Sequence, residues 1–391
     1  MKEVIMSKKW YFWLNCAILI TISLNLRAPI NVLGPMIESI REHYGISSAM
    51  FGFLSAIPII AFGSVSFIVS YFSDIKILFS ALCAVVLGEI GRSYGGITGL
   101  FVGTAFIGAG VAVANVLLPS FVKKKFPKHT TAMMALYSFV LNLSSVMGIW
   151  LALPLTYSIG VPHTLAFWLI FSILALMLYF PEIRNNRISR VKIRHKHTKS
   201  LMREIGAWKI TIFMGLQGFL AYSTFAWLPA IIAQKGYGLE YGTKVLLYSQ
   251  FVCVPVAFFG PLLLGVLREK HKSLYMAFLC SLYVIGYLCV LLGESQWTIY
   301  VAIVCIGAPM GGVFGLALLF ISQKSSSVMV ATKLSAMVQG FGYLIAASGP
   351  FAIGLLHDHF ESYTYGIIIV LCVAVALNIT GILAHRTKMI G

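Results

Sequence analysis

Charged residues are scarce in this 391-residue chain, making up only 10% of it, and just 12 of them are acidic. Hydrophobic residues make up 59%, and the mean hydropathy of +0.90 lies far above that of ordinary soluble proteins. The length would allow several globular domains, yet no stretch has the composition of one. The lack of charge argues against a soluble enzyme or binding module and indicates an integral membrane protein.

Motifs for catalysis and for metal or nucleotide binding are lacking too. The chain contains no HExxH, no Cys-x-x-Cys, no phosphate-binding glycine loop with lysine and no Ser-His-Asp candidate. Its seven cysteines fall in apolar segments without metal-ligand spacing, so we interpret them as small buried hydrophobic residues. We therefore expect neither an enzyme nor a cofactor or metal. The missing nucleotide site also argues against a primary pump.

Apolar runs long enough to cross a bilayer recur along the whole chain. Twelve can be separated, and the boundary between the third and fourth is the weakest, because only residues 92–96 divide them. The runs cover residues 10–37, 47–72, 75–93, 96–122, 130–156, 162–181, 207–232, 242–266, 273–292, 297–321, 331–356 and 363–384. The sequence thus predicts an all-α membrane protein with twelve transmembrane helices.

Basic residues give the chain a net charge of +17, which by itself would favour nucleic-acid binding. If the N-terminus is cytoplasmic, most basic residues fall in inner loops, whereas outer loops carry acidic residues such as Glu38 and Glu240. The positive-inside rule then places both termini in the cytoplasm. The basic cluster in residues 182–206 lacks interleaved aromatic residues, so we expect it to contact membrane lipids and no nucleic acid.

The loop at residues 182–206 divides the predicted spans six and six. It predicts an N-terminal bundle over residues 1–181 and a C-terminal bundle over residues 207–391, joined by this basic linker. The two parts are similar: residues 110–118 in span four match residues 311–319 in span ten, and a lysine follows each stretch. Two parallel six-span halves are the architecture of one large class of transporters.

One arginine lies deep in the first apolar run. A guanidinium keeps its charge in proteins, so Arg27 must find partners, and an ionisable group at this depth is a functional-site hypothesis by default. Asn31 lies one turn further on the same helical face, which favours a polar cavity. The alternative is a structural arginine that ties two helices together through backbone carbonyls.

Several blocks of sequence resemble one transporter family. Residues 25–30 read Asn-Leu-Arg-Ala-Pro-Ile, with Gly34 and Pro35 after them, and residues 110–119 read Gly-Val-Ala-Val-Ala-Asn-Val-Leu-Leu-Pro. Further blocks fall in residues 215–229 and 334–358. Together they resemble the cyanate-permease and 2-nitroimidazole-transporter family of the major facilitator superfamily. The resemblance implies the major facilitator fold: two six-helix pseudo-repeats around one central cavity, with alternating access for a small-molecule substrate.

The chain also departs from the superfamily pattern. Of the motif between spans two and three it keeps only Asp74, which we assign to gating, and Ile75 stands where an arginine is usual. The arginine that many relatives carry in span four is Gly103 here. Coupling to a proton or to a counter-transported ion therefore stays open.

In the facilitator arrangement, spans 1, 4, 7 and 10 line the cavity with help from spans 2, 5, 8 and 11. No carboxylate lies at the centre of any of these spans. A buried amide or phenol needs a partner, which is either the substrate or another helix. Gln339 and Tyr343 are four residues apart and share a helix face. The candidate substrate-binding residues are Arg27, Asn31, Asn115, Tyr137, Asn142, Gln217, Tyr222, Gln339 and Tyr343.

Other polar residues have structural interpretations. Trp227, near an outer helix end, is predicted to be an interfacial anchor. Glu89, a carboxylate within span three, is predicted to form an ion pair with Arg92, three residues on. His357 and Asp358 follow span eleven, so we place them at the outer rim, outside the cavity.

Three functions are compatible with these observations. The first is a secondary active or facilitative transporter of a small anionic or polar organic solute, cyanate-like or nitroimidazole-like, with Arg27 as cationic anchor. The second is export of neutral azole-like compounds, with Arg27 structural and Tyr222 and Tyr343 contacting the solute. The third is a membrane receptor without turnover. We expect a monomer in the cell inner membrane.

An epitope tag inserted in residues 182–206 tests the predicted orientation. Because basic residues concentrate there, we expect a label to reach the tag only from the cytoplasmic side. The measurement compares labelling of intact and of permeabilised cells. Labelling of the tag in intact cells would contradict the orientation.

Overall fold

A computed structural model describes the chain except for residues 1–7, 70–74, 127, 186–200, 294 and 327. The described residues are helical, with one isolated bridge between Ser325 and Ile390. The elements are α1 (Lys8–Leu24), α2 (Ala28–Asn31), α3 (Ile37–Tyr44), α4 (Ser48–Val69), α5 (Ile75–Tyr94), α6 (Gly96–Lys125), α7 (Thr130–Ala166), α8 (Leu169–Asn185), η1 (Leu201–Arg203), α9 (Ile205–Ile232), η2 (Ala233–Tyr237), α10 (Leu239–Val266), α11 (Glu269–Leu292), α12 (Gln296–Gln323), α13 (Val328–Phe360) and α14 (Thr364–His385).

Twelve helices, α1 and α4 to α14, account for the predicted spans within the described residues. Eleven stretches there are long and apolar enough to cross a membrane, and one of them, residues 139–183, runs through both α7 and α8. The predicted twelve-helix, all-α membrane fold is confirmed. The predicted boundary between residues 156 and 162 coincides with a break inside α7, because Gly160 has a non-helical backbone whose φ of 79° suits glycine.

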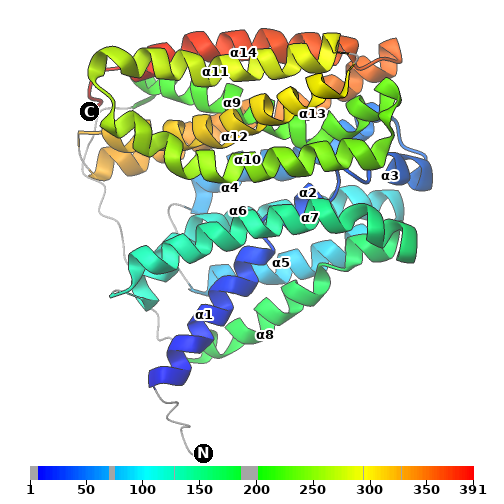
Figure 1. The fold of residues 1–391 in the computed structure, drawn as a ribbon. Coiled ribbons are helices and arrows are strands. Elements are labelled where there is room, and N and C mark those ends of the chain that lie inside the picture. The colour runs from blue at the N-terminus through cyan, green and yellow to red at the C-terminus, as the bar shows by residue number, and fades with distance from the viewer. Residues whose placement is uncertain (1–7, 70–74, 127, 186–200, 294, 327) are drawn as a thin grey trace, which may run out of the picture.

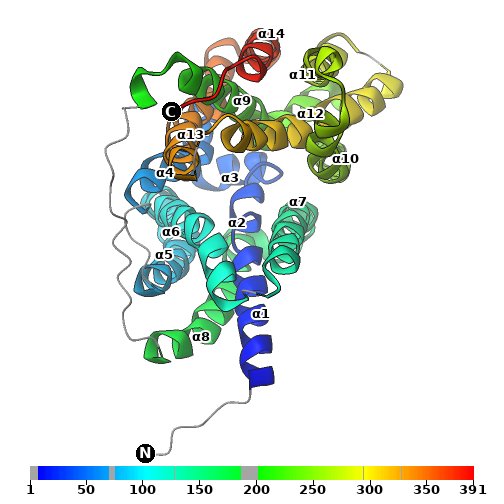
Figure 2. The same ribbon diagram turned by 90° about the vertical axis from the view of Figure 1, so that its left-hand side faces the viewer.

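The long helices lie in two groups (Figure 1). In this view α9 to α14 form the upper group, α1 and α5 to α8 the lower one, and α4 lies between them. Seen from the end, α4 lies directly beneath α13 (Figure 2), and these two helices share the most extensive contact in the described part of the chain. The division into two bundles at residues 182–206 stays a prediction.

Apolar side chains lie on the outside of the helices as well as between them. Ile18 and Phe213 are fully buried, whereas Trp150, Phe258 and Leu274 are each more than 60% exposed. Apolar surface of this kind is costly in water, but lipid tails are as apolar as the side chains themselves. The exposed apolar surface is therefore the expected lipid contact of a multi-pass membrane protein.

The first predicted span, residues 10–37, is interrupted, so the expectation of one continuous run is wrong here. α1 ends at Leu24 and α2 begins at Ala28. Pro29 explains the interruption, because it has no N–H to donate to the carbonyl of Asn25 and its ring would collide with that carbonyl in a helix. Residues 25–27, including Arg27, therefore lie in a break within the membrane.

At the end predicted to face outside, α13 caps the start of α4. The Asp358 carboxylate accepts hydrogen bonds from the backbone N–H groups of Ser48 (2.8 Å) and Ala49 (2.6 Å). The Ser48 hydroxyl lies 2.9 Å from Nδ1 of His357. A helix N-terminus has unpaired N–H groups and a partial positive charge, so a carboxylate there is stabilising. We call His357, Asp358, Ser48 and Ala49 the outer latch.

Beside the outer latch, α4 and α13 pass at close range. A Cβ atom on Gly52 would clash with the Pro350 carbonyl. Trp227 of α9 packs against the same place, since its Nε1 donates to the Pro350 carbonyl (2.8 Å) and its ring lies 5.5 Å from that of Phe51. Trp227 is fully buried, so its predicted role as interfacial anchor is wrong. Its N–H donates to a backbone carbonyl of α13 rather than to an interfacial partner.

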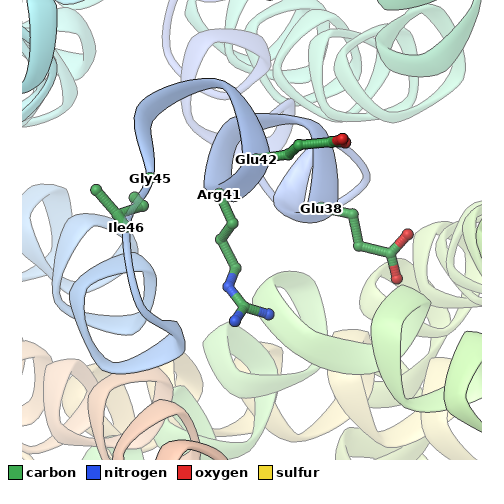
Figure 3. Close-up of a pocket in the computed structure, with 5 residues that line it drawn as sticks. All are labelled: Glu38, Arg41, Glu42, Gly45 and Ile46. Carbon is green, nitrogen blue, oxygen red and sulfur yellow. The ribbon is translucent and has the colours of Figure 1, made fainter.

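Arg41 extends from α3 toward the ribbons of α9 and α13 (Figure 3). It interacts electrostatically with His357 and with Tyr363, whose ring stacks on His357 at 4.1 Å. Burial raises the pKa of the Tyr363 phenol, which therefore stays neutral at physiological pH. The hollow beside Arg41 is lined by Glu38, Arg41, Glu42, Gly45 and Ile46.

Asp358→Ala tests the outer latch. It removes two hydrogen bonds that join α13 to α4, and loss of a helix cap costs about 0.5–2 kcal/mol. We expect a lower melting temperature of the purified protein in detergent. The matched control is His359→Ala, an exposed side chain at the same helix end, which should change little. Equal melting temperatures for the two variants would contradict a stabilising latch.

Candidate substrate-binding site

A serine on α7 replaces the helical hydrogen bond that the first span lacks. In a continuous helix, the N–H of Ala28 would donate to the carbonyl of Leu24. Instead, Ser144 Oγ accepts from the Ala28 N–H (2.9 Å) and donates to the Leu24 carbonyl. Gly148 lets α7 approach, because a Cβ there would lie 2.9 Å from Ala28 Cα. Both backbone groups are thus paired at a depth where an unpaired one costs several kcal/mol.

Arg92 of α5 gives the break a second support. Its side chain is fully buried, its Nη1 donates to the carbonyl of Pro29 (2.5 Å) and its Nη2 to the carbonyl of Leu165 (3.3 Å). The predicted ion pair between Glu89 and Arg92 is wrong, since the ion pairs of the described residues do not include it. The guanidinium reaches instead toward carbonyls of α2 and α7.

Asn25 connects the break in the first span to α8. Its Nδ2 donates to the carbonyl of Thr21 (2.8 Å), and its Oδ1 accepts from the hydroxyl of Ser172 (2.7 Å). Asn25 and Ser172 are both buried. Three helices of the N-terminal part, α5, α7 and α8, therefore fix the backbone on either side of Arg27.

Arg27 itself is the N-cap residue of α2 and is half-buried. Within the described part of the chain, its guanidinium has no hydrogen bond and no ion pair. It does interact electrostatically with side chains of α7, α9, α10 and α13. These are Tyr137, Tyr222, Cys253 and Tyr343. A charge that has no hydrogen-bond or ion-pair partner among the described residues thus lies between helices from both parts of the chain.

Aromatic rings lie beside this charge. The rings of Tyr222 and Tyr343 are 6.3 Å apart in an edge-to-face arrangement, and Phe62 lies 5.6 Å from Tyr343 in the same arrangement. Such pairs are favourable beyond the area that they bury. The three rings come from α9, α13 and α4, so the aromatic cluster joins helices of both parts close to Arg27.

The structure pairs three other predicted residues within the N-terminal part. The Tyr137 hydroxyl donates to Asn115 Oδ1 (3.1 Å), which joins α7 to α6. Asn31 Nδ2 donates to the hydroxyl of Ser145 (2.6 Å), and Asn31 is buried. The spacing of Asn31 and Arg27 is as predicted, but the Asn31 amide is engaged by α7. The part that these residues play in binding stays a prediction.

Two further candidates lie in the C-terminal part. Gln217 is buried and its Nε2 donates to the carbonyl of Met310 (3.2 Å), whereas Gln339 Nε2 donates to the hydroxyl of Ser335 (2.8 Å) within α13. Asn142 is half-buried on α7. The gating residue Asp74 lies outside the described residues.

Ser144 and Arg92 were missed as site residues. The sequence signal for Ser144 is a polar pair, residues 144–145, one turn before a glycine in a transmembrane run. That pattern marks a close helix approach but does not identify the partner helix. For Arg92, the nearby carboxylate of Glu89 favoured a local ion pair over the carbonyl contact that the structure has.

The sequence matches the family model of the Major Facilitator Superfamily over residues 14–347. It is 33% identical to the "Uncharacterized transporter YycB" of Bacillus subtilis (strain 168), covering 97% of this chain and 95% of that protein. Identity is 29% to the 2-nitroimidazole transporter of Escherichia coli (strain K12), with 95% of each covered. It is 26% to the cyanate transport protein CynX of the same organism, with 88% and 90% covered. The predicted family resemblance is confirmed, and these relatives are transporters rather than enzymes.

Solved structures share the architecture. The crystal structure of the nucleoside transporter NupG matches with a TM-score of 0.72 at 11% identity, covering 96% of this chain and all of that one. A D-xylose–proton symporter matches with a TM-score of 0.70 at 14% identity, covering 97% and 98%. At this level of identity the likeness concerns the fold alone. The major facilitator architecture predicted from the sequence is therefore confirmed.

Ser144→Ala tests the support of the break. It leaves the Ala28 N–H and the Leu24 carbonyl without their bridging hydroxyl, and each buried unpaired group costs about 1–3 kcal/mol. We expect a clear drop in the melting temperature of the purified protein. Ser158→Ala is the matched control, because Ser158 lies on the exposed part of the same helix. If the two variants have the same melting temperature, the Ser144 bridge does not stabilise the break.

Proposed function

Because the chain belongs to the Major Facilitator Superfamily, we propose that it moves a small anionic or polar organic solute across the membrane by alternating access. Arg27 is the cationic anchor for this solute. The observation that carries the proposal is the environment of Arg27: it is half-buried, lies at the break of the first span, and has no hydrogen bond or ion pair among the described residues.

An unpaired guanidinium favours an anionic ligand. It cannot lose its charge, and its planar fork of donors matches a carboxylate or a similar small anion. The carboxylates on the helices around Arg27 are engaged elsewhere: Glu240 of α10 forms an ion pair with Lys244, and Asp358 of α13 accepts hydrogen bonds from the start of α4. A bound anion would therefore supply the charge balance that the protein does not.

The position of Arg27 also suits alternating access. Its backbone is held by α5 and α7, whereas Tyr222 and Tyr343, which share its electrostatic surroundings, belong to α9 and α13. A solute between Arg27 and these phenols contacts both parts of the chain at once. Movement of one part against the other then changes access to the solute without moving the anchor within its own bundle.

The names of the relatives support a small solute. One relative is a 2-nitroimidazole transporter and another is a cyanate transport protein. A second candidate, transport of neutral azole-like compounds, is favoured by the edge-to-face pair of Tyr222 and Tyr343, which offers aromatic surfaces to a flat ring. Under that alternative Arg27 is structural, and the two tyrosines carry the binding.

Arg27→Lys and Arg27→Gln separate these candidates. Lysine keeps the charge but replaces a bidentate contact by a single point, and glutamine removes the charge. A lost hydrogen bond to a charged ligand costs about 1.5–3 kcal/mol, or roughly 10–100-fold in affinity. We expect Arg27→Lys to weaken cyanate binding by this factor and Arg27→Gln to abolish it. Binding of cyanate and of 2-nitroimidazole is measured on purified, monodisperse protein.

Arg386→Gln is the control for a general loss of positive charge, because Arg386 is exposed beyond α14. It should bind both compounds as the wild type does. Normal cyanate binding by a folded Arg27→Gln variant would contradict the anchor. If the Arg27→Gln variant still binds both compounds while Tyr222→Leu no longer binds 2-nitroimidazole, the neutral-azole candidate is correct.

A further inference from the structure

A second ionisable group lies inside the helices and has no direct partner in the part of the chain that the structure describes. Glu89 of α5 has no exposed surface, and neither of its carboxyl oxygens has a hydrogen bond in the described part of the chain. The hydroxyl of Ser172 faces this carboxyl but donates to Asn25 Oδ1 (2.7 Å). Burying an unpaired charge is far more costly than burying a neutral carboxyl. The buried, unpaired position of Glu89 therefore favours the neutral, protonated carboxyl.

Arg92 links Glu89 to the break of the first span. It lies three residues after Glu89, one turn along the same helix, and the two side chains interact electrostatically. Its Nη1 holds the carbonyl of Pro29, two residues after Arg27, while its Nε has no partner. The guanidinium thus bonds the Pro29 carbonyl while it interacts electrostatically with the Glu89 carboxyl, with which it forms no ion pair among the described residues.

Few other titratable groups face this pair. Residues 96–115 of α6, which packs along α5, contain none. Tyr44 of α3 interacts electrostatically with Arg92. α7 carries His163, which bonds Tyr94, and α8 carries Glu182, which pairs with Lys125 at the other end of that helix. Ser172 of α8 and Asn25, in the break after α1, are neutral. Arg92 is therefore the charge that responds to the ionisation of Glu89.

We propose that Glu89 is a proton-binding site that couples a proton gradient to movement of the segment carrying Arg27, an inference that rests on the proposed transport function. With the proton bound, Glu89 is neutral and Arg92 holds Pro29. When the proton leaves to water, the carboxylate attracts the guanidinium and weakens its bond to the Pro29 carbonyl. The segment at Arg27 is then released, and solute binding and proton binding influence each other reciprocally.

Infrared spectroscopy tests the proton site without any solute. We expect purified wild-type protein to show the carbonyl band of a buried protonated carboxyl, lost as the pH is raised and absent from Glu89→Gln. Glu240→Gln is the control and should keep the band, because Glu240 is an exposed carboxylate paired with Lys244. A wild type without such a band, or a Glu89→Gln variant that retains it, overturns the proposal. If Glu89→Gln does not fold, Ser172→Ala must shift the band, and an unshifted band counts against Glu89.

Flux in liposomes tests the coupling. With 2-nitroimidazole and cyanate as probes, we expect a pH gradient to drive accumulation by the wild type. Glu89→Gln should reduce this accumulation at least tenfold and reduce exchange without a gradient far less. Gradient-driven accumulation by Glu89→Gln at the wild-type level overturns the coupling. If neither probe moves in the wild type, the proposed function fails, and the infrared result still decides whether Glu89 binds a proton.

Discussion

Pairing of backbone groups at membrane depth is the constraint on which this structure depends. Hydrocarbon offers no hydrogen bonds, so a span has to be helical unless other protein groups pair its backbone. Pro29 breaks the first span and leaves backbone groups of Leu24, Ala28 and Pro29 without helical hydrogen bonds. The break persists because Ser144 and Arg92 form hydrogen bonds with these groups. The same break leaves Arg27 at membrane depth with its guanidinium free of protein partners among the described residues.

Two sets of contacts between helices lie at different depths in the membrane. The outer latch and the close approach at Gly52 hold α4 and α13 together at the predicted outer end. Deeper in the membrane, the side chains around Arg27 come from α7, α9, α10 and α13. Opening at one end while the solute contacts both parts in the middle is the motion that alternating access requires. Under the proposed function, the outer latch would oppose opening at this end, and a solute bound at Arg27 would act on the contacts between the two parts.

Sequence was sufficient for the spans and the family, because hydropathy and short motifs are visible locally. It also located an isolated charge, Arg27, within the first span, but the role of that residue stays a prediction. Sequence was not sufficient to predict which residues from distant parts of the chain contact each other. Ser144 lies 116 residues from Ala28, and Asp358 lies 310 residues from Ser48. The expected Glu89–Arg92 pair failed for the same reason: spacing along a helix predicts proximity but not the carbonyl of Pro29, 63 residues away from Arg92, that competes for the guanidinium.

The most direct test of the anchor is an experimental structure of the protein determined with and without cyanate. The account predicts solute density within hydrogen-bonding distance of the Arg27 guanidinium, on the side of Tyr222 and Tyr343, and a guanidinium without protein partners when cyanate is omitted. An Arg27 bonded to backbone carbonyls in both structures, with no solute beside it, would contradict the account.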